Sequence, residues 1–299
     1  MKRISSFTPF LALPSRTTMQ RLPRIPGYDL YQRLGGGPLT TVYSARDSAS
    51  EKPCAVKVIR DDWQDQPTAI KLLQREARAG LRVDSPRVVR FLDAHVTVAP
   101  YFLVMEWLSG ESLRRKLRRD YRLPPAQAFT VARQTAEGLA ALHRAGFVHG
   151  DVKPENVRVR DGGDVVLIDL GFAHRPGENA AFLRQGYVLG TPDYLAPELC
   201  RSNPQADYAS DLFSLGVTLF EMLTGKLPYP PGSLNQTFRR HGCDPPADVR
   251  QYAGPLPEES VLLLDRLLDR RPQERPTARE TVQALIGLEI ASLRLRHLG

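Results

Sequence analysis

The hydrophobic pattern of this chain changes once, near Trp107, from one typical of strands to one typical of helices. Before that point, short segments rich in β-branched and aromatic residues predict strands at 28–34, 40–46, 52–59, 88–96 and 101–107. One amphipathic helix is expected among them, from Pro67 to Val83. The first part of the chain therefore predicts a small sheet-rich lobe with a single helix.

From Glu111 onward, longer apolar periodicities dominate. They predict helices at 125–144, 209–223, 258–269 and 277–288. One hairpin interrupts them, with two short strands around the turn at 161–164. We expect an α+β fold with a small antiparallel-sheet lobe at 28–107, a larger mainly helical lobe at 111–288 and a helical extension at 289–299. A cleft between two such lobes is a natural ligand site.

The composition is that of an ordinary globular protein, with 42% apolar and 25% charged residues. We find no apolar run of about 18 residues, so no membrane span is expected. The three cysteines, Cys54, Cys200 and Cys243, are widely spaced and odd in number. This pattern excludes a disulfide framework and a paired-cysteine zinc site, and it fits the reducing cytoplasm.

The formal net charge is +8, and part of the excess lies in a leader that has no Asp or Glu before Asp29. A targeting peptide and a disordered basic tail over residues 1–27 are the two interpretations, and a start at Met19 fits the second. Pro9 and Pro14 break the apolar stretch and argue against a secretory signal. We predict the disordered leader and expect no nucleic-acid partner.

A second basic cluster spans Arg114 to Arg122 and follows Glu111. This order of charges suits a helix dipole, because acidic residues favour the first turn and basic residues the last. The cluster is interpreted either as a solvated helix face or as a dock for an acidic substrate.

Three glycines, Gly35 to Gly37, lie between the first two predicted strands. Glycine lets a backbone approach a phosphate closely and direct N–H groups at it. The signal is weak by itself, since glycines in a hairpin usually only form the turn. No helix follows, which excludes a Walker A loop and a dinucleotide fingerprint.

A lysine, Lys57, lies inside the apolar third strand, and Glu76 lies on the predicted helix nineteen residues later. A buried ammonium group is costly without a partner for its charge. A Lys57–Glu76 pair would hold a phosphate-binding ammonium in place. The alternative is a strand-edge lysine whose amine reaches water.

The segment His149-Gly150-Asp151-Val152-Lys153-Pro154-Glu155-Asn156 lies on a loop between the long helix and the hairpin. Asp151, Lys153 and Asn156 can converge there. The second strand of the hairpin ends in Asp169-Leu170-Gly171, where a carboxylate suits a magnesium ion bound to phosphates. The segment 190–198, Gly-Thr-Pro-Asp-Tyr-Leu-Ala-Pro-Glu, follows.

Taken in order and with this spacing, these motifs resemble those of a bacterial member of the eukaryotic-type (Hanks-type) serine/threonine protein kinase family. The resemblance covers about residues 28–288. The segment 207–216 resembles the family's buried helix with its anchoring Asp211. Arg275, in the segment 270–276, resembles the arginine that would pair with Glu198.

The resemblance implies a two-lobed protein-kinase fold that uses ATP and Mg²⁺ and modifies Ser or Thr of protein substrates. Asp151 would accept the proton of the substrate hydroxyl, Lys153 would neutralise γ-phosphate charge, and Glu76 would orient Lys57. Asn156 and Asp169 would be the metal ligands. The nucleotide would be held by Leu34, Gly35, Gly37, Val42, Ala55, Lys57, Met105, Glu106 and Leu108.

Three positions depart from the family pattern. Thr40 replaces the third glycine of the loop, which would stiffen the loop and lower the ATP affinity. We interpret Thr40 as an ordinary strand residue, and phosphorylation of Thr40 is the alternative. Arg158 lies where an apolar floor for the adenine is expected, so either its aliphatic stem covers the ring or it weakens nucleotide binding. Gly150 replaces the arginine that grips a phosphorylated loop in relatives.

The segment 172–189 contains no Ser or Thr, only Tyr187. The absence of Ser and Thr agrees with the replacement of the phosphate-binding arginine by Gly150. We expect an enzyme that does not need loop Ser/Thr phosphorylation, and regulation that comes from partner proteins or from the leader.

Two other functions remain as alternatives. The His-Gly-Asp sequence at 149–151 also occurs in small-molecule kinases of the aminoglycoside or choline type, although the segments at 169–171 and 190–198 argue against them. A pseudokinase scaffold would explain Thr40 and Arg158, although the complete set of catalytic residues argues against it.

Overall fold

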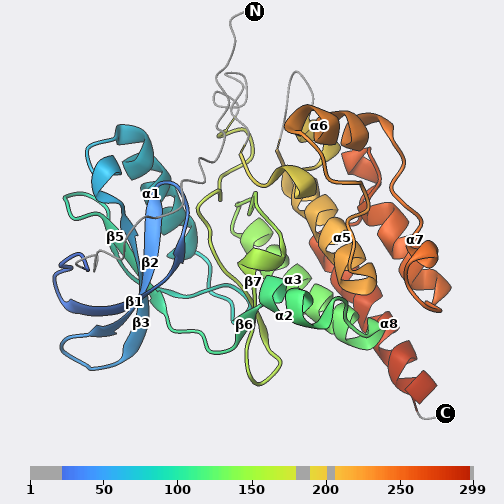
Figure 1. The fold of residues 1–299 in the computed structure, drawn as a ribbon, viewed down its shortest axis with the longest axis horizontal. Coiled ribbons are helices and arrows are strands. Elements are labelled where there is room, and N and C mark those ends of the chain that lie inside the picture. The colour runs from blue at the N-terminus through green and yellow to red at the C-terminus, as the bar shows by residue number, and fades with distance from the viewer. Residues whose placement is uncertain (1–21, 180–188, 201–205, 297–299) are drawn as a thin grey trace, which may run out of the picture.

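The computed structural model describes residues 22–179, 189–200 and 206–296. Two lobes lie side by side, with the sheet of the first on the left of Figure 1 and the helices of the second on the right. The predicted two-lobed α+β fold is confirmed. Residues 107–110 connect the lobes between the last strand of the first sheet and Glu111.

The first lobe is a five-stranded antiparallel sheet in the order β1-β2-β3-β5-β4. Its strands are β1 (Tyr28–Gly36), β2 (Thr40–Asp47), β3 (Pro53–Ile59), β4 (Phe91–His95) and β5 (Phe102–Glu106). Helix α1 (Pro67–Gly80) packs against it and ends three residues before the predicted Val83. The 3-10 turn Asp61–Trp63 precedes this helix.

Strand β3 is buried on both faces, which explains its nearly continuous apolar sequence. Side chains alternate along a strand, so Val56 and Val58 point into a small outer core with Phe102, while Lys57 and Ile59 point to the opposite face. Alternation therefore directs the one charged side chain of the strand toward α1 and the second lobe. Ile25, just before β1, is buried in the same outer core.

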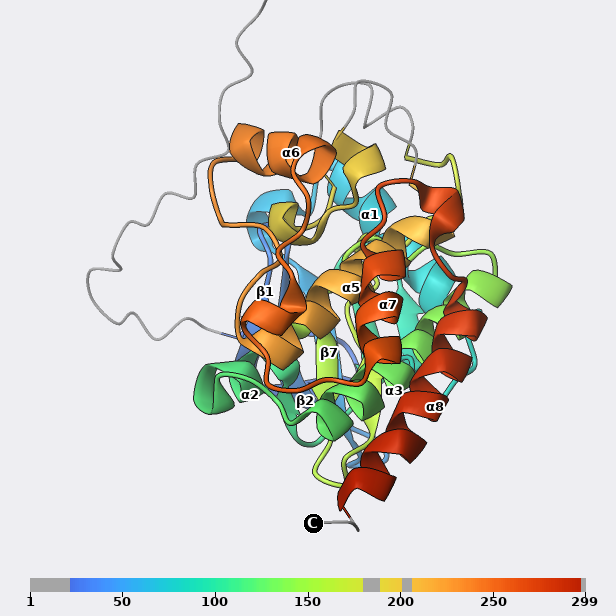
Figure 2. The same cartoon turned by 90° about the vertical axis from the view of Figure 1, so that its right-hand side faces the viewer.

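The second lobe is built from helices α2 (Leu113–Asp120), α3 (Pro125–Arg144), α5 (Tyr208–Thr224), α6 (Leu234–Cys243), α7 (Glu258–Leu267) and α8 (Ala278–Arg296). A small sheet in the order β6-β7-β8 joins them, with strands β6 (Glu111–Ser112), β7 (Val157–Val159) and β8 (Val165–Leu167). Helix α8 packs along α3, and α7 packs against α5. In Figure 2, α7 and α8 face the viewer.

Helix α5 is buried along nearly its whole length, as its apolar sequence predicts. Asp207 caps its start through a capping box with Ser210, and Gly225 ends it in the left-handed conformation with φ 73°. Helix α3 has the predicted bounds, because proline fixes its start. Helix α8 continues through residue 288 without a break.

Helix α6 was not predicted. Only Thr237 and His241 of its side chains are buried, so it lacks the apolar stripe that marks a helix in a sequence. Its Ser233–Gln236 capping box was the available signal. Within the described residues, no helix is both long and apolar enough to cross a bilayer.

Candidate active site

Lys57 is held between two carboxylates. Its Nζ lies 2.8 Å from Glu76 Oε1 and 2.7 Å from Asp169 Oδ1, and Lys57 is only 7% exposed. The predicted Lys57–Glu76 pair is therefore formed, and Lys57 is not an exposed strand-edge residue. Burial alone would lower the pKa of Lys57, but the nearby Asp169 and Glu76 outweigh burial and raise it. The ammonium group therefore stays charged at neutral pH.

Asp169 follows β8 and adopts the left-handed backbone region with φ 62°, which is unusual for a residue other than glycine. This turn directs its carboxylate back to Lys57 and to the backbone N–H of Gly171. Desolvation opposes its ionisation although the side chain is 47% exposed, but the Lys57 ammonium outweighs this and lowers the pKa of Asp169 to about 2. A negative charge is thus fixed beside the ammonium group of Lys57.

Asn156 ends the 3-10 turn Pro154–Asn156, directly before β7 of the same hairpin. Its backbone C=O accepts a 2.9 Å hydrogen bond from the N–H of Ile168, the residue before Asp169. The amide oxygen of Asn156 and the carboxylate of Asp169 are hard oxygen donors, the type that Mg²⁺ prefers. The donor set of these two residues therefore fits a magnesium ion that also binds phosphate oxygens.

The Asp151 side chain is nearly buried and has three neighbours. Asn156 Nδ2 donates to Asp151 Oδ2 at 3.0 Å, and Thr191 Oγ1 donates to Asp151 Oδ1 at 2.8 Å. Lys153 Nζ lies 2.7 Å from Asp151 Oδ2 and also contacts Thr191. Asp151, Lys153 and Asn156 therefore converge as predicted. The contact with Thr191 had not been predicted.

Asp211, at the buried start of α5, holds the loop that carries Asp151. Its two carboxylate oxygens accept the N–H groups of His149 and Gly150 at 2.8 and 2.9 Å, and His143 Nε2 lies 2.9 Å away. Burial opposes ionisation of Asp211, but His143 and these N–H groups lower its pKa. Asp211 therefore contacts this loop through both of its carboxylate oxygens.

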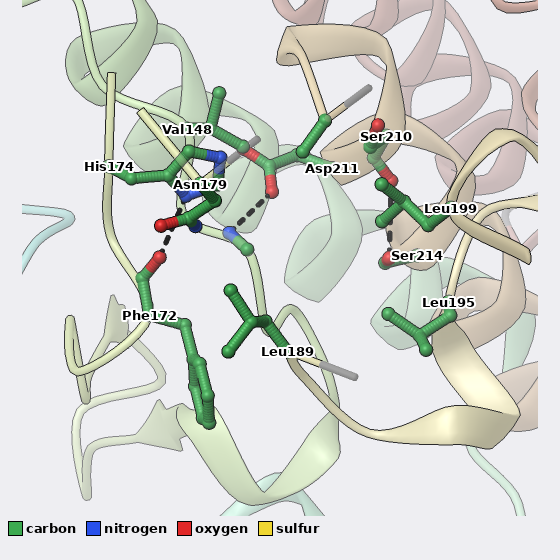
Figure 3. A pocket seen from close by; sticks show the side chains of 12 residues that line it. Val148, Phe172, His174, Asn179, Leu189, Leu195, Leu199, Ser210, Asp211 and Ser214 are labelled. Carbon is green, nitrogen blue, oxygen red and sulfur yellow. Dashed lines mark hydrogen bonds between the residues drawn. The ribbon is translucent and has the colours of Figure 1, made fainter. Parts of the chain in front are cut away.

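Gly150 adopts φ +80°, and a Cβ placed there would lie 2.9 Å from the backbone oxygen of Phe172. A small pocket opens beside it, between the loop, Phe172, His174 and the start of α5. Figure 3 shows the hydrogen bond between this loop and Asp211 as a dashed line. Position 150 has no side chain, so it directs no cation into this pocket.

Glu198 and Arg275 form a buried two-pronged ion pair, with Nη1–Oε1 and Nη2–Oε2 both at 2.7 Å. Ser210 donates to the same carboxylate at 2.9 Å, and Arg275 also donates to the backbone C=O of Asp269 at 2.8 Å. The predicted pair is formed, and it joins the segment 190–198 to α5 and to the chain before α8.

The residues expected to hold the nucleotide lie on the first sheet and the connector. Strand pairing places Val42 opposite Lys57 and Ala55 opposite Met105, on neighbouring strands. The N–H of Glu106 is already bonded to the C=O of Arg90 at 2.9 Å. Leu34, Gly35 and Gly37 lie at the β1–β2 hairpin, where the N–H of Gly37 donates to Thr40, and Leu108 lies on the connector.

Arg158 turns its guanidinium toward the connector. Its Nη2 and Nε donate to the backbone C=O groups of Leu108 and Ser109, both at 3.1 Å. The guanidinium therefore uses the C=O of Leu108, and sequence reasoning did not find this contact. Partial burial lowers the pKa of Arg158.

Arg158→Leu should lower stability by about 1 kcal/mol, because it removes two hydrogen bonds to the connector. In a domain of this size the melting temperature should fall by about 2–4 °C. Calorimetry is the measurement, with the exposed Arg82→Leu as the matched control. An Arg158→Leu protein that melts like the control would mean that the guanidinium does not brace the connector.

The basic cluster on α2 is mostly paired within the chain. Arg119 binds Glu111 and Asp120, and Lys116 binds Asp120. Arg114 points inward, to Glu155, Glu221 and Tyr194. These pairs favour the interpretation as a helix face over that of a substrate dock. The inward orientation of the Arg114 side chain was not predicted.

The family model for the protein kinase domain matches residues 28–285. A serine/threonine-protein kinase of Corynebacterium efficiens, drp72, is 36% identical over 217 residues, which are 70% of this chain and 41% of the relative. PknL of Mycobacterium tuberculosis is 37% identical over 220 residues, 73% of this chain and 55% of the relative.

A third relative is the probable serine/threonine-protein kinase pknA2 of Bifidobacterium longum. It is 32% identical over 265 residues, 86% of this chain and 35% of the relative. In these three comparisons the matched region spans about a third to a half of the relative's length. From the family match and the arrangement of the site residues together, we conclude that the chain belongs to the protein kinase domain family.

Proposed function

We propose that this protein is a serine/threonine protein kinase that transfers the γ-phosphoryl group of ATP to a protein hydroxyl. The observation that carries the proposal is the convergence of two groups of side chains. Lys57 binds Glu76 and Asp169, while Asp151 binds Asn156 and contacts Lys153. The backbone bond between Asn156 and Ile168 joins the two groups into one site.

Each group has a defined task in the proposed reaction. Asp151 accepts the proton of the attacking hydroxyl and orients its oxygen, as a carboxylate within hydrogen-bond reach can. Lys153, next to Asp151, neutralises charge on the γ-phosphoryl group, and Lys57 binds the α- and β-phosphates. Asn156 and Asp169 would hold Mg²⁺, which neutralises charge on the phosphates when it is bound.

Positioning accounts for most of the expected rate enhancement. Asp211 fixes the loop of Asp151, and Glu76 fixes the ammonium group of Lys57, before substrate arrives. Because phosphoryl transfer needs little covalent help from the protein, such preorganised charges are the main contribution. The adenine is proposed to lie against Val42, Ala55 and Met105.

Specificity for Ser and Thr is supported by Lys153 and Thr191. The Thr191 hydroxyl lies between Asp151 and Lys153 and bonds to both. Lys153 follows the serine/threonine pattern of the family, and the relatives named above are serine/threonine-protein kinases. Ser and Thr hydroxyls of protein substrates are therefore the proposed acceptors.

Activity is also proposed to be independent of Ser/Thr phosphorylation in the segment 172–189. Gly150 offers no cation to such a phosphate, and part of the segment, including Tyr187, lies outside the described residues. Treatment of the purified protein with a phosphatase should leave its turnover number unchanged. Activity that disappears with this treatment and returns with phosphate in this segment would overturn the proposal.

The test of the proposed function is autophosphorylation with labelled ATP and mass-spectrometric mapping of the modified residues. Transfer to Ser or Thr that is absent in Lys57→Met is expected. Absence of ATP turnover in the wild-type protein would favour the pseudokinase alternative, which Thr40 and Arg158 motivate. Transfer to an aminoglycoside or choline, with none to proteins, would favour the small-molecule kinase.

A cytoplasmic location and a regulatory protein partner complete the proposal. All three cysteines are free, which supports a reducing compartment. Fractionation of cells that express the full chain tests the location, and co-purification tests the partner.

A further inference from the structure

Two arginines of α1, one on each side of Glu76 in the sequence, bind residues of the second lobe. Arg75 is 8% exposed, and the Arg78 side chain is about one-third exposed. Both reach residues that follow the Asp169-Leu170-Gly171 motif. Residues on both sides of Glu76 therefore contact the second lobe.

Both arginines form ion pairs with the same carboxylate, that of Glu178. Arg78 Nη2 lies 2.7 and 2.6 Å from the two oxygens of Glu178, and Arg75 Nε lies 3.3 Å from Glu178 Oε1. Asn179, which is nearly buried, accepts a 2.9 Å hydrogen bond from Arg75 Nη1. We refer to Arg75, Arg78 and Glu178 as the clasp. Its two ends are 100 residues apart in sequence.

Glu178 is held in place by its own turn. The N–H of Arg175 donates to Glu178 Oε2 at 3.0 Å, and the N–H of Glu178 donates to the C=O of Arg175 at 3.0 Å. Burial opposes ionisation of Glu178, but Arg78, the N–H of Arg175 and the charge of Arg75 lower its pKa. The carboxylate is thus a fixed negative charge at neutral pH.

Arg78 of the clasp and the nearby Arg175 also contact Phe147, at the start of the loop that carries Asp151, here called the catalytic loop. The guanidinium carbons of Arg78 and Arg175 lie 5.8 and 5.9 Å from the centre of the buried Phe147 ring, within range of a cation–π contact. Phe147 precedes Val148, whose backbone pairs with that of His174. Asn179 and His174 both line the pocket of Figure 3. The helix, the turn and the catalytic loop therefore meet at this place.

We propose that Glu178 is a positioning residue that holds α1, and through Glu76 the ammonium group of Lys57, in the geometry for phosphoryl transfer. Its carboxylate provides, without any modification, the negative charge that a phosphorylated side chain could provide at such a site. An added phosphate can order a segment by binding arginines, and here a carboxylate already does so. The inference rests on the proposed function, and it assigns to Glu178 a role in regulating the same site.

Glu178→Gln keeps the size of the side chain and removes its charge. We expect turnover to fall about tenfold, because hydrogen bonds to charged groups contribute at least that factor. Hydrogen exchange of the α1 amides should rise by about the same factor, since the helix opens locally more often. Glu178→Asp keeps the charge and should restore most of the turnover and most of the protection.

Glu137→Gln is the matched control. Glu137 also receives two arginines, Arg87 and Arg133, and its side chain is 30% exposed compared with 22% for Glu178. It lies on α3, outside the clasp, so its substitution should leave the exchange of α1 unchanged. Arg78→Gln breaks the clasp from the other side and should reproduce the effect of Glu178→Gln on α1.

The outcomes separate this inference from the proposed function. Equal exchange of α1 in Glu178→Gln and Glu137→Gln would overturn the role of Glu178. An active wild-type enzyme whose turnover depends on phosphate in residues 180–188 would overturn it as well. If the wild-type protein transfers no phosphate but α1 still loosens only in Glu178→Gln and Arg78→Gln, the clasp stands and the kinase proposal falls.

Discussion

Asp151→Asn is expected to lower the turnover number by about a thousandfold, the range found when a positioned general base is lost. An asparagine has nearly the same shape and can keep contacts with Asn156 and Thr191. It can neither accept the proton of the attacking hydroxyl nor balance the charge of Lys153. Steady-state rates at saturating ATP and peptide are the measurement.

Two controls keep this result interpretable. The exposed Asp161→Asn, in the turn of the β7–β8 hairpin, should leave turnover unchanged. The melting temperature of Asp151→Asn should stay close to that of the wild type, which shows that the fold is intact. Turnover within tenfold of the wild type would mean that Asp151 is not the base, and the proposed mechanism would be wrong.

Lys57→Met is expected to reduce turnover by about a hundredfold or more, as the loss of a fixed charge on the reacting group does. It should also lower the free energy of unfolding by about 3 kcal/mol, because it leaves a buried carboxylate without a partner. That carboxylate is Glu76, which is 2% exposed. Kinetics and chemical denaturation measure the two effects separately.

The double variant Lys57→Met/Glu76→Leu separates stability from catalysis. Removal of the unpaired carboxylate should restore most of the stability, while turnover stays as low as in the single variant. Lys52→Met, at an exposed lysine before β3, is the control for the loss of one charge. If the double variant regained turnover, Lys57 would be a structural residue only.

Local sequence patterns predicted most of the architecture. The strands of the first sheet, the β7–β8 hairpin and helices α3 and α5 follow from periodicity, proline and glycine, which act within a few residues. The same rules missed α6, whose burial depends on two polar side chains, Thr237 and His241. They also placed the end of α1 too late.

The sequence by itself determined the order of elements and the chemical types at the site: a lysine in a buried strand, a carboxylate on a loop and a carboxylate at a strand end. Periodicity and short motifs are local, so the amino-acid sequence alone is enough to identify them. Tertiary structure alone decided which distant groups meet, as with Thr191 at Asp151, Arg158 at the connector and Glu178 at Arg78. The physical reason is that such contacts form between segments up to 100 residues apart, where packing of the two lobes, and no local rule, sets the distance.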